Sequence, residues 1–244
     1  VETQLTVDKI HNIWHPQIVN DVHQQGANGA RIFIPPYLQP VEPNVPKEII
    51  EGYTELGNFM ADEMRKEGFV GITTDSTYDA WTPARAYSHY HGGVRILTET
   101  ASARLATPIP VEFNNLRGSE GYDAKKESQN FKPLWKGGDW KLRDITNYMT
   151  NSTFQLLKHA SANREKWLKR FYSIGKEAVQ SRKNGELFAY IIEPNNSYEI
   201  RKILERGNVE FQWFADGSTQ KVAVPMNQPY SKFAKALLEN QVYP

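Results

Sequence analysis

The sequence predicts an α/β protein, because segments with strand character alternate with amphipathic helices along the chain. Short apolar runs rich in β-branched residues, as at 18–22 and 30–34, are typical of strands. Apolar residues recur at helical spacing over longer stretches, as at 46–66. Beyond residue 184 the order strand, helix, strand is typical of a β-α-β unit.

The first elements are short. Residues 7–15 show a helical spacing of apolar groups that ends before a proline. Strands are expected over 18–22 and 30–34, separated by a glycine-containing turn. The prolines between residues 35 and 46 predict an extended surface loop, of the kind that often lines binding sites.

A long helix over 46–66 has the clearest local pattern. Proline stands at its first position, one face is apolar, and Gly68 follows its last residues. A short strand over 69–73 comes next. Residues 75–85 then combine turn formers with aromatic side chains, which indicates a functional loop, and the following strand contains Glu99.

The next helical pattern runs from Asp144, a good N-cap residue, to about residue 178. It predicts one long amphipathic helix or two helices joined near Asn163. The opposite face carries four basic residues, which we interpret as solvated charge and not as a nucleic-acid surface. They are Lys158, Arg164, Lys169 and Arg170.

Asn184-Gly185 marks the expected boundary between two units, 1–183 and 184–244. The second unit begins with a strand over 187–192 and a helix capped by Asn196. A strand over 209–214 completes the β-α-β unit. Because no G-x-G-x-x-G follows the first of these strands, a dinucleotide site there is not expected.

Composition excludes several classes of function. The 244 residues include 29 basic and 28 acidic side chains, so there is no net field to favour nucleic acid or an anionic membrane. No apolar run is long enough for a membrane span, and no signal peptide is recognisable at the amino terminus. The absence of cysteine leaves histidine, aspartate and glutamate as ligands for any metal.

His23 is the first candidate site residue, because it lies where an apolar strand pattern stops. Asp21 precedes it by two residues, and therefore shares its face of the strand. A histidine ligand of a metal is commonly oriented by such a carboxylate. The alternative is a hydrogen-bonded histidine with a structural role.

Glu99 is the second candidate. Apolar residues precede it and small residues follow it, so its carboxyl should be partly desolvated. Desolvation raises a carboxyl pKa toward the range that suits a general base. The alternative is a glutamate that pairs with Arg95 or Arg104 at the end of its strand.

Other side chains are compatible with chemistry but also with structural roles. His89 and His91 lie two residues apart and can form a two-ligand metal clip, although a Gly-Gly turn follows them. His11 and His15 lie four apart without the glutamate of a zincin motif. In the 75–85 loop, Tyr78 and Arg85 are residue types that act on a substrate carboxylate.

Three stretches resemble the carboxyl-terminal half of bacterial zinc metallocarboxypeptidases of the carboxypeptidase A type. They are His15-Pro-Gln-Ile-Val-Asn-Asp-Val-His23-Gln-Gln-Gly, Phe33-Ile-Pro-Pro36 and Arg95-Ile-Leu-Thr-Glu99-Thr-Ala-Ser. The resemblance covers residues 7–110, and the end of the chain is similar to the appended second domain of some members. It implies a central mixed sheet flanked by helices, incomplete at its amino terminus and followed by the start of a smaller α/β domain.

The resemblance also implies roles for the candidates. His23 matches the third zinc ligand, and Glu99 matches the catalytic glutamate. Tyr78 matches a loop tyrosine that closes over the peptide substrate, and Arg85 falls near the position that sets side-chain preference. The implied function is a secreted zinc hydrolase, periplasmic or extracellular, that removes carboxyl-terminal residues from peptides.

In the family, a His-x-x-Glu segment that supplies two zinc ligands and an Asn-Arg segment that binds the substrate carboxylate lie upstream, and neither has a counterpart before His23 in this chain. We therefore expect an upstream segment of the same protein to complete the site. Two alternatives remain open. One is a related zinc amidohydrolase acting on acyl-amino acids or cell-wall peptides, and the other is a non-catalytic binding module that has lost the metal site.

Overall fold

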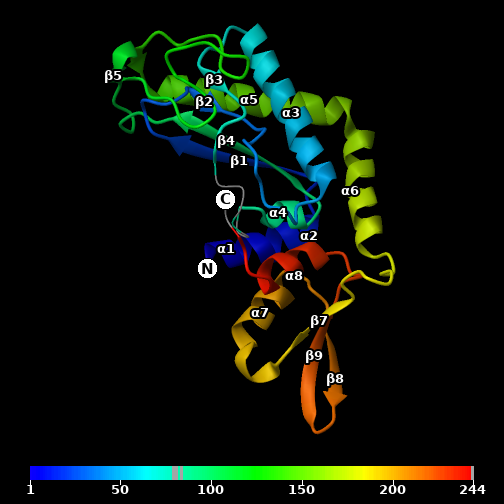
Figure 1. Cartoon of the computed structure of the whole chain (residues 1–244). Helices are drawn as coiled ribbons and strands as arrows, with labels where there is room; N and C mark the ends of the chain where they lie inside the picture. Colours follow the sequence, from blue (N-terminus) through cyan, green and yellow to red (C-terminus); the bar gives the residue numbers. More distant parts are fainter. Residues whose placement is uncertain (79–81, 83–84, 243–244) are drawn as a thin grey trace.

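The computed structural model describes residues 1–78, 82 and 85–242 of the chain. It is a mixed α/β structure in which helices flank a mixed sheet (Figure 1). The predicted α/β class is confirmed at this level. Five residues of the expected functional loop, 79–81 and 83–84, lie outside the described residues, as do 243–244.

The central sheet has four strands, in the order β1-β4-β2-β3. Strands β1 and β4 run parallel, β2 is antiparallel to β4, and β2 and β3 are parallel. All four strands were expected from the sequence. Their bounds are Ile18–Gln25 (β1), Ile32–Phe33 (β2), Ile72–Thr73 (β3) and Val94–Ala101 (β4).

Strand β1 is longer than its apolar pattern. The pattern stops at Val22, whereas the strand continues to Gln25, because pairing with β4 continues through polar residues. His23 therefore lies inside β1 and not at its end. Burial differs sharply between the two partners, since every residue of β4 is buried while those of β1 are half-buried or exposed.

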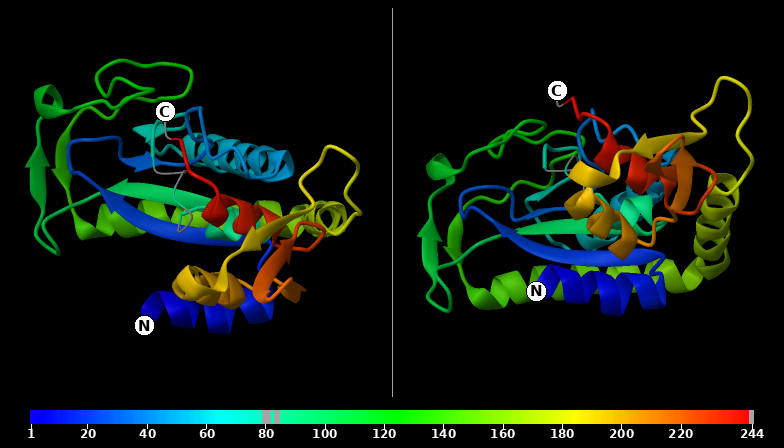
Figure 2. Two further views of the ribbon diagram at one scale, coloured as in Figure 1. Left: turned by 60° about the horizontal axis from the view of Figure 1, so that its bottom comes forward. Right: turned by 90° about the horizontal axis from the view of Figure 1, so that it is seen from below.

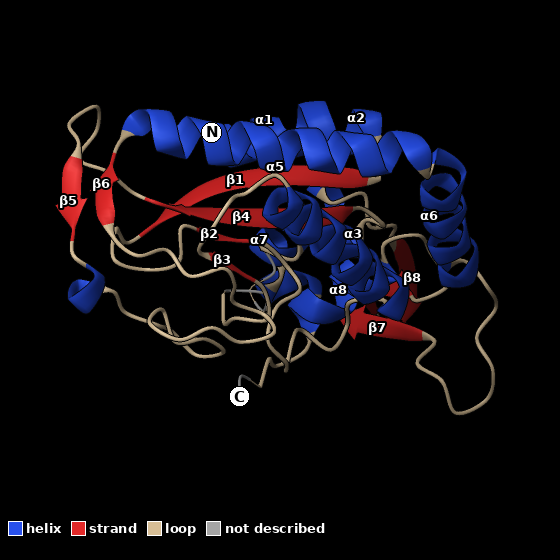
Figure 3. Ribbon diagram, turned by 90° about the horizontal axis from the view of Figure 1, so that it is seen from above, coloured by secondary structure: helices blue, strands red, loops and turns tan. Residues whose placement is uncertain are grey.

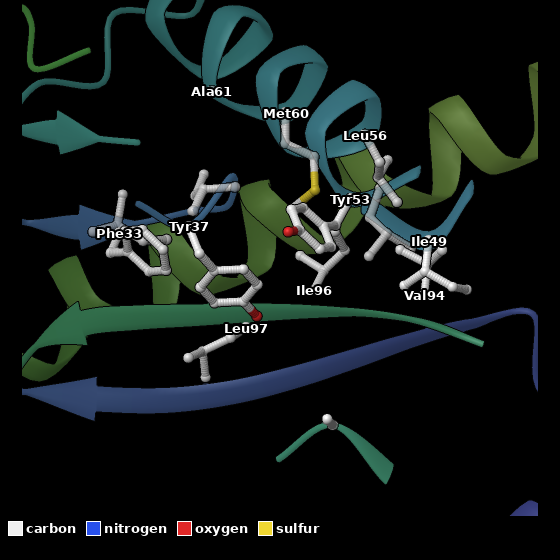
Figure 4. Close-up of a cluster of buried hydrophobic side chains, with 14 of the residues drawn as sticks. Phe33, Tyr37, Ile49, Tyr53, Leu56, Met60, Ala61, Val94, Ile96 and Leu97 are labelled. Carbon is white, nitrogen blue, oxygen red and sulfur yellow. The ribbon is translucent and has the colours of Figure 1, made fainter. Parts of the chain in front are cut away.

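Helices α3 (Lys47–Lys66) and α5 (Leu142–Ala162) pack together over one face of the sheet (Figures 1 and 3). Helix α3 begins one residue after the predicted proline. Val94 and Ile96 of β4 point toward its buried face, where Leu56 and Met60 meet them (Figure 4). Burial of this apolar face fixes the helix on the sheet, at roughly 1.5–3 kcal/mol for each large side chain removed from water.

A break at Asn163 separates α5 from α6 (Arg164–Ala178). Of the two predicted arrangements, one long helix or two helices joined near Asn163, the structure therefore has two helices. The predicted N-cap is wrong by three residues. Asp144 is the third residue of the helix, and its carboxylate accepts a hydrogen bond from the backbone of Lys141 at 3.0 Å. This is the reciprocal half of a capping box.

The basic face of these helices is only partly solvated. Lys158 and Lys169 are exposed, but the side chain of Arg170 is 9% exposed. Its guanidinium lies 3.0 Å from the carboxylate of Glu55 on α3. The interpretation of Arg170 as solvated charge is therefore wrong, because this side chain joins α6 to α3.

The opposite face of the sheet carries the amino-terminal helical segment, the short helix α4 (Tyr87–Tyr90) and the carboxyl-terminal unit (Figures 1 and 2). Residues 2–14 form a continuous helical segment whose middle turns are a π-helix, which extends the predicted helix toward the amino terminus. Its parts are Glu2–Thr6 (α1), Val7–His11 (η1) and Asn12–Trp14 (α2). Between β4 and α5 lie Ile109–Val111 (β5), Phe113–Asn115 (η2) and Gly138–Trp140 (β6).

The carboxyl-terminal unit contains a separate three-stranded sheet, in the order β7-β9-β8. Both outer strands are antiparallel to β9, so β7 and β8 run parallel to each other and α7 connects them. The predicted β-α-β unit is present, with a third strand between its two strands. Its bounds are Ala189–Ile192 (β7), Pro194–Asn196 (η3), Tyr198–Arg206 (α7), Gln212–Asp216 (β8), Thr219–Pro225 (β9) and Ser231–Leu238 (α8).

The carboxyl-terminal unit differs from expectation at the start of its helix, and it contacts the first part of the chain. The residue before α7 is Ser197 and not Asn196. The unit packs against the first part of the chain, where Phe233 of α8 lies against Tyr87 of α4 with ring centroids 5.2 Å apart. The boundary at residue 184 falls in the connection between α6 and β7 and stays a prediction.

Among the described residues, no helix combines the length and the apolar character that a membrane span requires.

Candidate functional site

His23 and Glu99 are direct neighbours on adjacent strands. The parallel register of β1 and β4 pairs them, and paired residues point to the same side of a sheet. The Nδ1 atom of His23 lies 3.9 Å from Oε1 of Glu99. The structure therefore brings together the two residues that the sequence singled out.

The carboxylate of Asp21 holds His23 from the other side of its ring. Its Oδ1 lies 2.9 Å from Nε2 of the imidazole. Its Oδ2 accepts a hydrogen bond of 2.6 Å from Nε of Arg95. Arg95 lies on the adjacent strand β4, opposite Val19, and its side chain is almost fully buried. The arginine fixes the carboxylate, and the carboxylate in turn fixes the ring, as an outer-shell partner does for a ligand histidine.

Arg85 also approaches Nε2 of His23. The guanidinium of Arg85 lies 3.2 Å from Nε2 of His23. Because Nε2 has one hydrogen-bonding direction, it cannot serve both partners. The shorter contact and the negative charge of Asp21 favour Nε2–H donating to the carboxylate, which leaves the lone pair of Nδ1 on the side of Glu99.

The side chain of Glu99 is nearly enclosed, with the residue 9% exposed. Burial raises its pKa above the ordinary value, and the nearby charges of His23, Arg85 and Arg95 oppose that rise. Among the described residues it forms no ion pair with Arg95 or Arg104, so the structural alternative for Glu99 is not formed. A partly desolvated carboxylate with raised pKa suits proton transfer.

Tyr78 lies beside this pair. Its ring stacks on Phe33 at a centroid distance of 4.0 Å, and its hydroxyl donates to Oε1 of Gln25 at 2.6 Å. The amide of Gln25 donates in turn to the backbone carbonyl of Glu99 at 2.9 Å. Burial raises the pKa of Tyr78 well above its usual range, which keeps the hydroxyl protonated as a donor.

A hollow of about 420 Å³ adjoins Tyr78 and Gln25, which both line it. Loop 26–29 and Arg117 contribute to its walls, and none of the described residues that line it is acidic. The hollow is open to solvent at the carboxyl end of β1. Open α/β sheets bind ligands at this end of their strands.

His23 is oriented to hold a metal, but the described residues of this site do not provide a full ligand set. Among residues 1–78, 82 and 85–242, no group of three or more histidine, cysteine or acidic side chains is arranged to hold a metal ion. The Nδ1 of His23, with Nε2 oriented by Asp21, has the character of a single ligand. Catalytic zinc requires three protein ligands, so the described residues do not hold it alone.

The other histidines have structural contacts. Both nitrogens of His91 lie close to backbone carbonyl oxygens, those of Tyr87 at 2.8 Å and Gly207 at 3.0 Å. His89 is enclosed, and burial lowers its pKa to about 3. The two-histidine clip that the sequence allows is not formed, because residues 87–90 are helical and both ring nitrogens of His91 lie against backbone carbonyl oxygens.

The amino-terminal pair of histidines also packs against aromatic rings. His11 makes an edge contact with Tyr87 at 5.1 Å between centroids. Nδ1 of His15 lies 3.3 Å from the hydroxyl of Tyr230. Both contacts agree with structural roles.

Comparison with protein-family models, with curated proteins and with solved structures gives no match for this chain.

Three residues of the site had no predicted role: Gln25, Arg95 as the partner of Asp21, and Phe33. Gln25 was predictable from the sequence, because side chains alternate between the two faces of a strand and Gln25 therefore shares a face with Asp21 and His23. The partners Arg95 and Phe33 depend on the pairing of β4 with β1 and β2, which local patterns do not specify.

Proposed function

We propose that this chain is part of a zinc-dependent hydrolase of the carboxypeptidase A type, which removes carboxyl-terminal residues from peptides. The observation that supports this best is the pairing of His23 with Glu99, because it combines one oriented imidazole with one desolvated carboxylate at 3.9 Å. Metal-assisted peptide hydrolysis needs such a ligand and such a base within reach of one water molecule.

In this proposal Nδ1 of His23 is a zinc ligand. Bound zinc would polarise the scissile carbonyl and lower the pKa of a water molecule. The carboxylate of Glu99 would take a proton from the attacking water and pass it to the leaving amine. Asp21 keeps the imidazole in the tautomer that presents Nδ1, and Arg95 keeps Asp21 in place.

Tyr78 and Arg85 are the proposed substrate contacts. The hydroxyl of Tyr78 is a neutral donor, and a peptide carboxylate or carbonyl would replace Gln25 as its acceptor. The guanidinium of Arg85, next to His23, offers a bidentate partner for a carboxylate. Substrate binding would thus exchange contacts within the site for contacts with the peptide.

The remaining zinc ligands would come from an upstream segment of the same protein, in a zinc-carboxypeptidase-like sheet of which these four strands are a part. Among the described residues, no group of three or more histidine, cysteine or acidic side chains is arranged to hold a metal ion, so the proposal requires ligands from elsewhere. A related amidohydrolase would use the same chemistry on acyl-amino acids or cell-wall peptides. A panel of carboxyl-terminal peptides and acyl-amino acids, assayed on the polypeptide extended on its amino-terminal side, separates these two functions.

Equilibrium dialysis against zinc tests the proposal. We expect one zinc per extended polypeptide, and weak or no binding by the 244 residues alone. His23→Ala in the extended polypeptide should lose most of the zinc, whereas the matched variant His15→Ala should retain it. Absence of zinc from every form would favour the non-catalytic binding module.

A further inference from the structure

A small hollow lies where helices α3, α6 and α8 come together (Figures 1 and 3). Its volume is about 230 Å³, and its walls include the first turns of α3 and α8 and the last turn of α6. Pockets for drug-sized ligands are usually larger, about 300–1,000 Å³. The hollow therefore suits an ion or a small group, and it lies between the carboxyl-terminal unit and the first part of the chain.

Two uncapped helix starts meet at this hollow. Neither α3 nor α8 has a side chain that caps its first turn. The N–H groups of Lys47 and Glu48 in α3, and of Lys232 in α8, have no acceptor among the described residues. The start of a helix carries a partial positive charge, and N–H groups there bind anions. Both helix starts therefore favour an anion in the same hollow.

Ser231 is a separate indication of a ligand. It lines the hollow, and only 1% of it is exposed. Its hydroxyl makes no hydrogen bond with any described residue. Hydroxyl groups enclosed by protein normally have a hydrogen-bond partner, because an unpaired buried donor is costly. A ligand in the hollow would supply that partner.

Three cationic side chains also line the hollow: Lys47, Arg182 and Lys232. Arg182 donates through Nε to the carbonyl of Met226 at 3.0 Å and through Nη2 to that of Ala178 at 3.0 Å. The second bond covers the end of α6, whose partial negative charge would otherwise oppose an anion. The Nη1 atom of Arg182 has no partner among the described residues and is available to a ligand.

Two carboxylates, those of Glu48 and Glu177, line the same hollow and limit the choice of anion. A carboxylate repels a fully ionised anion but accepts a strong hydrogen bond from an O–H group. Inorganic phosphate keeps at least one P–OH group near neutral pH, whereas sulfate has none. The mixture of cations and carboxylates therefore favours an oxyanion that carries its own proton.

We propose that this hollow binds one hydrogen phosphate ion between the start of α3 and the start of α8. The four oxygens of a tetrahedral ion point in different directions, so they accept hydrogen bonds from both helix starts, from Ser231 and from Arg182 at once. The P–OH group donates to one of the two carboxylates. The ion thereby fastens α8 to α3. This site does not depend on the proposed hydrolase function.

An NMR titration of the isotope-labelled 244-residue chain tests the proposal at constant ionic strength. Inorganic phosphate should shift the amide signals of Lys47, Glu48 and Lys232 in a saturable way. Its Kd should be at least about tenfold lower than that of sulfate, because sulfate cannot donate to a carboxylate. Glycerol phosphate at about pH 7.5 is mostly a dianion without P–OH, since its second pKa is about 6, and it should bind no better than sulfate.

Variants of the cationic wall test the same site. Lys232→Glu reverses a charge at the hollow and should raise the Kd for phosphate about tenfold or more. Lys169→Glu makes the same change at an exposed position of α6 outside the hollow, and its Kd should stay within about twofold. Ser231→Ala removes one hydrogen bond and should raise the Kd by about threefold to tenfold.

A double variant, Glu48→Gln with Glu177→Gln, tests the selectivity. It should bind sulfate more tightly than the unmodified chain does, so that the preference for phosphate over sulfate is lost. Glu165→Gln, at an exposed position of α6 outside the hollow, is the control and should keep that preference.

The decisive results come from the unmodified chain, so they do not depend on whether a variant folds. Absence of saturable shifts at millimolar phosphate would overturn the proposal. Equal affinity for phosphate and sulfate would also overturn it, because attraction of any anion to the helix starts would then explain the binding. Tighter binding of glycerol phosphate than of the free ion would reject the ion as the ligand.

Discussion

The imidazole of His23 and the carboxylate of Glu99 face each other across the parallel pair β1 and β4, with Nδ1 3.9 Å from Oε1. Each belongs to a strand whose other residues hold the sheet together, so the pair is positioned by backbone register and not by a loop. Rigid elements place functional groups more precisely than loops do. The predictions below test what each neighbour of this pair contributes.

Asp21→Asn should destabilise the fold by about 2–3 kcal/mol. The substitution leaves the guanidinium of Arg95, whose side chain is 5% exposed, without its carboxylate partner. Zinc affinity of the extended polypeptide should also fall about 10–100-fold, because His23 loses its orienting group. Urea unfolding and zinc titration measure the two effects, and unchanged values for both would show that Asp21 does not support the site.

Glu99→Gln should change how stability depends on pH. The raised pKa of Glu99 means that the folded state binds its proton more tightly than the unfolded state. The stability from this group is complete below the unfolded pKa and is lost as pH rises through the folded pKa. The variant should therefore gain stability relative to the unmodified protein as pH rises from about 4 to 7.

Thermal unfolding of both proteins across this pH range provides the measurement. The difference between them should be smallest at the acid end. A difference that is constant with pH would show that Glu99 titrates alike in the folded and unfolded states.

Tyr78→Phe should lower the free energy of unfolding by about 1 kcal/mol. The hydroxyl donates to the partly buried amide of Gln25, and the variant leaves that acceptor unpaired. Tyr172→Phe, at a position 65% exposed, is the control and should stay within about 0.5 kcal/mol. Equal effects at the two positions would argue against a structural link between Tyr78 and β1.

Gly57→Ala should destabilise the protein by about 3 kcal/mol or more, although alanine is the better helix former. A Cβ atom at this position of α3 would overlap the carbonyl oxygen of Pro35. Gly175→Ala in α6 is the matched control, since nothing lies within 4 Å of its added Cβ atom, and it should stabilise by about 0.5–1 kcal/mol. Chemical denaturation of the two variants compares them directly; similar shifts would mean that α3 does not approach Pro35 closely.

The sequence predicted which helices and strands form better than it predicted the residues at which they begin and end. The apolar periods correctly located β1, β4, α3 and the α5–α6 pair, because burial of one face decides whether each forms. Ends depend on contacts from elsewhere in the chain. Strand β1 continues past its apolar run because β4 pairs with it, and α5 begins before Asp144 because that residue caps from inside the helix.

The site was predictable where it follows from strand alternation and unpredictable where it depends on pairing. Asp21 and His23 share a face by local geometry alone. The register that brings His23 opposite Glu99, and Arg95 opposite Val19 and close to Asp21, joins segments over seventy residues apart. A local sequence pattern does not predict such a register between distant strands.

The most direct test of the central claim uses Glu99→Gln in the polypeptide extended on its amino-terminal side. Release of the carboxyl-terminal residue from a peptide and zinc content are measured on the same sample. The proposed roles predict that turnover falls at least about a thousandfold while one zinc remains bound, because the base is lost and the ligand His23 is kept. Turnover that persists in the variant would contradict the assignment of Glu99 and, with it, the paired site on β1 and β4.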